Sequence, residues 1–149
     1  MSTTQPLFQH HKHCDEIFAD AEAACANGDW VAGATAFADF AGQLETHFKS
    51  EEEVLFPAFE SATGMVSGPT EVMRGEHRQM RELLAQMKQA LDERDGDGFG
   101  GTAETLLIMM QQHNMKEENI LYPMCDQHLA EEAEELVPQL GVELAAAGK

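Results

Sequence analysis

Apolar residues recur every three or four positions along most of the chain, which is the spacing of amphipathic helices. Proline occurs only five times and β-branched residues are sparse, so the pattern does not favour strands. Together with the turn residues between them, the apolar stretches predict four long helices and a short, acidic fifth one. Their expected bounds are about 6–26, 30–60, 70–93, 102–126 and 129–141.

Glycine, asparagine and proline mark the ends of these helices. Asn27-Gly28 and Gly64 are typical helix C-termini, and the glycine-rich segment 95–101 reads as a loop, with Thr102 as the cap of the fourth long helix. Pro123 predicts a kink near the end of that helix. Four helices of this length with short connections predict an all-α, up-down-up-down four-helix bundle over about 6–127, within a single domain over 1–149.

The two halves of the chain match at a fixed offset (113 − 47 = 66). Residues 47–57 and 113–123 share their histidine, a pair of glutamates, a leucine and a proline at equivalent positions. The same offset relates His11 to His77, and His10 to Glu76. The repeat therefore selects His11 from the three N-terminal histidines.

Each half ends in a His-x-x-x-Glu sequence, formed by His47 and Glu51 and by His113 and Glu117. Positions i and i+4 lie about 40° apart around a helix, so each pair shares a face, and those faces are otherwise apolar. Burying an unpaired carboxylate costs several kcal/mol, and no Lys or Arg lies on these faces, so a bound cation is expected. The predicted metal ligands are His11, His47, Glu51, His77, His113 and Glu117.

Other polar residues near this pattern are expected outside the site. Glu52 and Glu118, at i+5, point about 140° away from the histidines and should face water. Tyr122 falls about 180° from His113 by helical phase, so it should lie away from the metal unless Pro123 kinks the helix.

The remaining histidines are expected to be solvated. These are His10, His13 and His128, with His10 or His13 as the alternative to His11 in the ligand set.

Imidazole and carboxylate ligands without thiolate favour iron or manganese over structural zinc. Two glutamates can bridge two ions about 3.5–4 Å apart, which leaves coordination positions open for water, an oxo bridge or dioxygen. The symmetric arrangement places His11 and His47 on one ion, His77 and His113 on the other, and Glu51 and Glu117 between them. The Glu-x-x-His of ferritin-like di-iron proteins is absent at the candidate ligands.

The pattern of these six residues resembles the hemerythrin family, specifically its bacterial HHE cation-binding branch, over about residues 7–127. The resemblance implies a non-haem di-iron centre, oxo- or hydroxo-bridged, that takes a small ligand such as dioxygen, nitric oxide or peroxide. Manganese and zinc are less favoured. Oxygen-carrying hemerythrins have a histidine where this chain has Met73, and a thioether is a poor ligand for ferric iron, so the chain offers four histidines where the carriers offer five.

The carriers also place an aspartate five residues after the histidine that matches His113. Here Glu117 stands at four residues and Glu118 at five, and the side-chain face favours Glu117. The six-ligand set is similar to that of iron-sensing hemerythrin domains and of di-iron proteins that repair iron–sulfur clusters under nitric oxide stress.

These comparisons define three hypotheses. The first is a di-iron protein that binds or senses dioxygen, iron or nitric oxide without turnover. The second is a di-iron enzyme of oxidative or nitrosative stress, such as a peroxidase, a nitric oxide reductase or a cluster-repair protein. The third is a helical interaction module with a structural metal.

The amino-acid composition limits which partners the protein is expected to bind and where in the cell it is expected to lie. Nine basic against 27 acidic residues give a net charge of −18, which disfavours nucleic acid and anionic membranes as partners. No apolar run approaches the roughly 20 residues of a membrane span, and no signal peptide is visible at the N-terminus. An odd number of cysteines without C-x-x-C spacing suits a reducing compartment. The sequence therefore predicts a cytoplasmic protein and fixes no oligomeric state.

Overall fold

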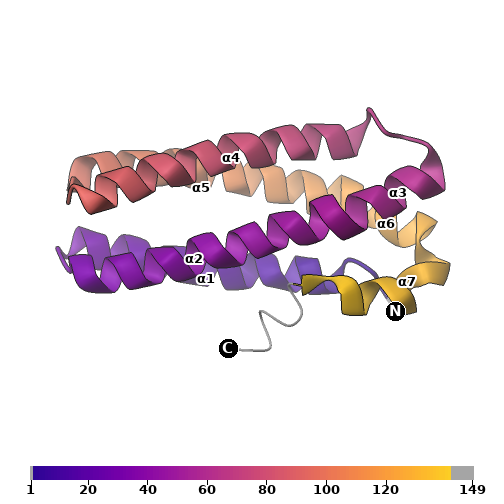
Figure 1. Ribbon diagram of the computed structural model, residues 1–149, viewed down its shortest axis with the longest axis horizontal. Coiled ribbons are helices and arrows are strands. Elements are labelled where there is room, and N and C mark those ends of the chain that lie inside the picture. Colours follow the sequence, from indigo (N-terminus) through magenta and orange to yellow (C-terminus); the bar gives the residue numbers. More distant parts are fainter. Residues whose placement is uncertain (1, 142–149) are drawn as a thin grey trace.

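The computed structural model describes residues 2–141, and helices make up nearly all of that range (Figure 1). The α-helices are α1 (Gln5–Ala26), α2 (Trp30–Ser50), α3 (Phe56–Thr63), α4 (Pro69–Asp92), α5 (Gly96–Lys116), α6 (Tyr122–His128) and α7 (Ala133–Leu136). The π-helical turns η1 (Glu51–Leu55) and η2 (Glu117–Leu121) join α2 to α3 and α5 to α6. The 3-10 turns η3 (Ala130–Glu132) and η4 (Val137–Gln139) flank α7. The predicted all-helical bundle is confirmed.

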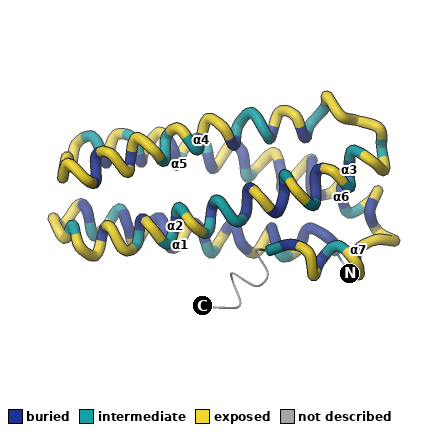
Figure 2. The backbone as a smooth tube through the Cα atoms, in the orientation of Figure 1, coloured by how far each residue is buried: buried dark blue, intermediate teal, exposed yellow. Residues whose placement is uncertain are grey.

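The long helices pack as two pairs, α1 with α2 and α4 with α5, and the pairs meet through α1 with α5 and α2 with α4 (Figure 1). Buried residues follow the inward faces along the length of the bundle (Figure 2). They form two apolar clusters. One fills the end near the α1–α2 connection and includes Phe18, Phe40 and Met80; the other fills the opposite end and includes Leu7 and Phe56. The polar site lies between them.

Both π turns precede a proline. The N–H of Phe56 bonds to the carbonyl of Glu51, and the N–H of Tyr122 to that of Glu117, five residues back in each case. The next residue is proline, whose ring crowds the carbonyl four residues before it in an α-helix. A π turn widens the helix at this point, inserts one extra residue and lets the chain continue as α3 or α6.

Residues 96–101 of the glycine-rich segment are helical, so the predicted loop over 95–101 is wrong. α5 begins at Gly96, and the Asp95 side chain accepts a hydrogen bond from the Gly98 N–H at 3.0 Å, which is an N-cap. A Cβ at Gly98 would collide with Asp95 Oδ2, so the glycine leaves space for the capping carboxylate. Phe99 is buried and anchors this first turn, which leaves Thr102 inside the helix rather than at its start.

The acidic segment after α6 forms the short η3–α7–η4 unit rather than one continuous helix. Its buried Leu129 and Leu140 join the apolar cluster of Leu7 and Phe56, with Leu136 packed against them. The acidic segment therefore packs its apolar side chains against one end of the bundle. Within residues 2–141, no helix is both long enough and apolar enough to cross a bilayer.

The Asp95 cap gives a stability prediction. Asp95→Ala leaves an N-terminal N–H of α5 without its acceptor and should lower the free energy of unfolding by about 1 kcal/mol. Asp95→Asn keeps a capping oxygen and should stay close to the wild type. Denaturant unfolding followed by circular dichroism measures both. Equal stability of Asp95→Ala and the wild type would contradict this cap.

Candidate metal centre

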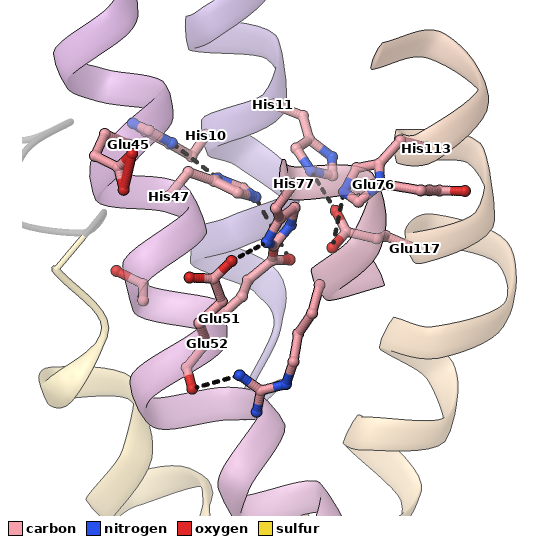
Figure 3. A network of polar contacts seen from close by, with 12 residues as sticks. His10, His11, Glu45, His47, Glu51, Glu52, Glu76, His77, His113 and Glu117 are labelled. Atoms are coloured by element: carbon pink, nitrogen blue, oxygen red, sulfur yellow. Dashed lines mark hydrogen bonds and ion pairs between the residues drawn. The ribbon is translucent and has the colours of Figure 1, made fainter. Parts of the chain in front are cut away.

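The six side chains predicted as metal ligands lie together in the middle of the bundle, and all are buried (Figure 3). They are His11 from α1, His47 from α2, Glu51 from η1, His77 from α4, His113 from α5 and Glu117 from η2. Each π turn thus begins with the glutamate of one His-x-x-x-Glu sequence.

Glu51 divides its two oxygens between two histidines. Its Oε1 lies 3.0 Å from Nε2 of His77, and its Oε2 lies 3.6 Å from Nε2 of His47. A carboxylate placed in this way can bridge two ions.

Glu117 repeats the arrangement from the opposite side. Its Oε1 lies 3.0 Å from Nε2 of His11, and its Oε2 lies 3.4 Å from Nε2 of His113. The site therefore has two halves, which we call the His11–His47 pole and the His77–His113 pole. Each pole has two imidazoles and one oxygen from each carboxylate.

The His77–His113 pole holds buried atoms that lack hydrogen-bond partners. They are Glu51 Oε1, His77 Nε2, His113 Nε2 and Glu117 Oε2. These four residues can each offer a ligand atom within 4.8 Å of the others, as can His11, His47 and Glu117 at the other pole. Unpartnered buried polar atoms are costly, and a cation at this point would satisfy all four. The residues present therefore fit a metal ion.

Each histidine of the site also has a partner on the outer nitrogen of its ring. Carboxylates accept from three of them at 2.7 Å: Glu118 from His11, Glu52 from His77 and Glu76 from His113. The fourth, His47, has Nδ1 only 3.0 Å from Nδ1 of His10. Such outer partners fix the ring so that Nε2 presents its lone pair to the metal.

In the ion-free chain, the carboxylates of the site favour protonation of His77 and His113. Burial alone would lower the pKa of His77 and His113, but the surrounding carboxylates outweigh it and raise both, that of His113 to about 9. Glu117 and Glu51 contribute to the rise at both residues. The site thus attracts positive charge at these nitrogens.

The comparison with protein-family models agrees with this geometry. The model of the hemerythrin HHE cation-binding domain matches residues 3–125. The chain belongs to the hemerythrin HHE family. The comparison with curated proteins and the comparison with solved structures returned no match. Membership of this family and the buried His/Glu cluster are together consistent with metal binding.

Two of the outer partners in this hemerythrin domain were expected to face water, and that expectation is wrong. Glu52 reaches from η1 to His77 on α4, and Glu118 reaches from η2 to His11 on α1. Helical phase describes only the helix that carries each glutamate. These two side chains lie where neighbouring helices pack together, and they contact a histidine on the adjacent helix.

Cations support the outer carboxylates of the His77–His113 pole. Arg81 binds both Glu52 and Glu45, and Lys116 binds Glu76. Partial burial would raise the pKa of Glu52, but its contacts with His77 and Arg81 lower it to about 2. This carboxylate therefore stays ionised as an acceptor for His77.

His10 is buried, so the expectation that it is solvated is also wrong. Burial, and then the neighbouring His47, lowers its pKa to about 4, so the ring is neutral. Its Nε2 lies 2.9 Å from Gln43 Oε1 and can donate to it, which leaves Nδ1 as an acceptor for His47. The repeat relates His10 to Glu76, and both residues accept from a histidine of the site.

The other positions singled out by the sequence lie outside the cluster. His128 is exposed, as expected, whereas His13 is partly buried with its ring 5.7 Å from that of His10. Met73 is buried within the apolar cluster of Leu7 and Phe56.

Tyr122 lies inside the site, which corrects the expectation that it points away. Its hydroxyl donates to Glu51 Oε2 at 2.6 Å. The extra residue in η2 reduces the nominal angle between His113 and Tyr122 from about 180° to about 80°, which turns the ring inward. Burial, with the nearby carboxylates, raises the pKa of Tyr122 well above 10 in the ion-free chain, so its hydroxyl keeps its proton.

The outer carboxylates generate a second prediction. Glu52→Gln removes the charged acceptor that orients His77 and should weaken Fe²⁺ binding about 10- to 100-fold. Glu53→Gln removes the same charge from an adjacent, exposed position and should leave the affinity nearly unchanged. Competition with a chromogenic chelator measures both. Equal losses of Fe²⁺ affinity in the two variants would show that the affinity depends only on the net charge near the site.

Proposed function

We propose that this protein holds two iron ions between its four central helices and uses them to bind or sense dioxygen, or alternatively iron or nitric oxide. The proposed ligands are His11 and His47 for one ion, His77 and His113 for the other, and Glu51 and Glu117 as bridges. The observation that supports this most strongly is the division of each carboxylate, one oxygen toward each pole.

The charges near the site favour two ions. Five carboxylates surround the four imidazoles, and Arg81 and Lys116 offset two of them. Three negative charges then remain in a largely buried region, more than one divalent ion neutralises. The five are Glu51, Glu52, Glu76, Glu117 and Glu118.

The donor set supports iron over zinc. Imidazole and carboxylate suit iron, whereas structural zinc commonly has thiolate ligands. Cys14 is the cysteine nearest in sequence to the histidines, and burial raises its pKa to about 12, so it stays a neutral thiol. Manganese would suit the same donors, and it is the family resemblance that favours iron over manganese.

The protein's own residues would exclude bulk water, fix the four imidazoles and neutralise the ions. Bound iron would supply reversible redox chemistry and open coordination positions for a small ligand. Met73 supports such a position, because its buried thioether stands where oxygen carriers have a further histidine.

Three further proposals complete this assignment. The three-residue connection between α1 and α2, Asn27–Asp29, and the short one between α4 and α5 support an up-down-up-down order of the long helices. We also propose that residues 1–149 form a single domain. Residues 1 and 142–149 of that range lie outside the part of the chain that the structure describes. The net charge and cysteine content support a location in the cytoplasm.

The ligand assignment predicts how iron content changes with mutation. Wild-type protein loaded without oxygen should hold two irons per chain. His11→Ala should lose the iron of one pole, while His13→Ala should keep both. Glu51→Ala should lower the content of both poles because it removes a bridge. Elemental analysis against protein concentration measures all four proteins, and a larger loss in His13→Ala than in His11→Ala would contradict the assignment.

The function itself is tested by the visible spectrum of the loaded protein. Reduction followed by exposure to oxygen should produce a charge-transfer band that disappears when oxygen is removed. A spectrum that does not respond to oxygen, nitric oxide or reduction would indicate a structural metal and overturn the proposal. Consumption of peroxide or nitric oxide over many cycles would replace it with an enzymatic function.

A further inference from the structure

The two poles differ by one hydroxyl group. At the His11–His47 pole, Tyr122 Oη lies 2.6 Å from Glu51 Oε2, 3.1 Å from Glu117 Oε1, and 3.3 Å from Nε2 of both His11 and His47. These four atoms are the ones assigned to the ion of that pole. The tyrosine oxygen is therefore in contact with every proposed protein ligand of one ion.

The other pole has a phenylalanine in the equivalent position. The offset of 66 relates Tyr122 to Phe56, and both residues follow a π turn and precede a proline. Their rings stack on the equivalent histidines in the same way. The ring centroids of Tyr122 and His11 are 5.6 Å apart, those of Phe56 and His77 are 5.9 Å apart, and the angle between the ring planes is 17° in both pairs. Phe56 thus brings no oxygen to its pole, which is the pole with the four unpartnered atoms.

Hydrogen bonding alone does not account for the surroundings of Tyr122. A phenol has one proton to donate, and its shortest contact, to Glu51, uses it. Nε2 of His47 carries a lone pair, because its outer nitrogen bonds to His10. Nε2 of His11 contacts Glu117 Oε1 at 3.0 Å as well as the phenol oxygen. His11 Nε2 and Glu117 Oε1 can share one proton between them, so with His47 Nε2 the phenol oxygen still meets more acceptors than there are protons to bond them.

A shared cation resolves this crowding. Neighbouring ligands of an octahedral ion with bonds of about 2.1 Å stand about 3 Å apart, which is the range of these four contacts. We propose that the phenolate oxygen of Tyr122 is a ligand of the ion at the His11–His47 pole, and that the exchangeable position for a small ligand is on the ion of the His77–His113 pole. This inference rests on the di-iron site proposed above.

The proton balance of this step is simple. The O–H bond of Tyr122 breaks, an oxygen–metal bond forms, and the proton leaves to water, as metal binding generally releases protons from its ligands. The oxidation state of the ion does not change. The ion at the His11–His47 pole would then have one more protein ligand than its neighbour, because Phe56 brings no oxygen to the other pole.

Tyr122 is the only tyrosine in the chain, so any tyrosinate signal belongs to it. Full-length protein is loaded with Fe²⁺, oxidised in air, and examined by visible absorption and by resonance Raman excited in the charge-transfer band. Wild-type protein should show phenolate ring modes. Tyr122→Phe keeps the ring and should lose these modes while retaining iron at the His77–His113 pole. The exchange variant Tyr122→Phe/Phe56→Tyr should regain them.

The outcomes separate this inference from the proposed function. Wild-type protein that holds two irons but shows no phenolate modes would overturn the role of Tyr122 and leave the di-iron site standing. Wild-type protein that binds no iron would overturn both. Modes that persist in Tyr122→Phe would also overturn the inference, because that variant has no tyrosine. Circular dichroism of each variant confirms that it is folded.

Discussion

Two carboxylates buried among four imidazoles set the central constraint on this molecule. The outer nitrogen of each ring already has a partner, so the inner nitrogens direct lone pairs at carboxylate oxygens. Lone pairs and anionic oxygens repel each other at 3 Å, and removing such groups from water costs several kcal/mol per charge. Positive charge must lie between them, and the carboxylates accordingly raise the pKa of His113 in the ion-free chain. The apolar clusters on both sides hold this arrangement away from water.

The duplication in the sequence builds the site, and local departures from it make the two halves different. Each half supplies a first-helix histidine and a His-x-x-x-Glu that ends in a π turn. Arg81 and Lys116 support the carboxylates around His77 and His113, whereas His10 supports His47 as a neutral ring. Tyr122 adds a hydroxyl to one pole only. A symmetric framework thus gives two inequivalent poles, and the proposed pair of ions would occupy different surroundings.

Much of the fold and of the candidate site was predictable from the sequence, because the spacing of apolar residues and the internal repeat can both be read directly from the chain. The helices, the six clustered residues and the choice of His11 over His13 all follow from apolar spacing and the offset of 66. Features that depend on a neighbouring helix were missed. Glu52 and Glu118 were assigned to solvent because their own helices place them at the surface, and the histidines they contact lie on other helices.

The remaining errors share one cause, which is backbone geometry that departs from an ideal α-helix or loop. Tyr122 was misplaced because the π turn adds one residue that helical phase does not count. The aromatic-proline pair at the end of each repeat was the available signal for that turn. The start of α5 was misread because glycine suggested a loop, while the Asp95 cap and the buried Phe99 stabilise a helix there.

The most direct test of the central claim is the position of the metal itself. Crystals of protein loaded with iron, measured at energies on both sides of the iron absorption edge, locate each ion by anomalous scattering. The account predicts two peaks about 3.5–4 Å apart, one between His11 and His47 and one between His77 and His113, with Glu51 and Glu117 spanning them. A fully loaded crystal with no peak inside the bundle, or with iron bound only to surface carboxylates, would contradict it.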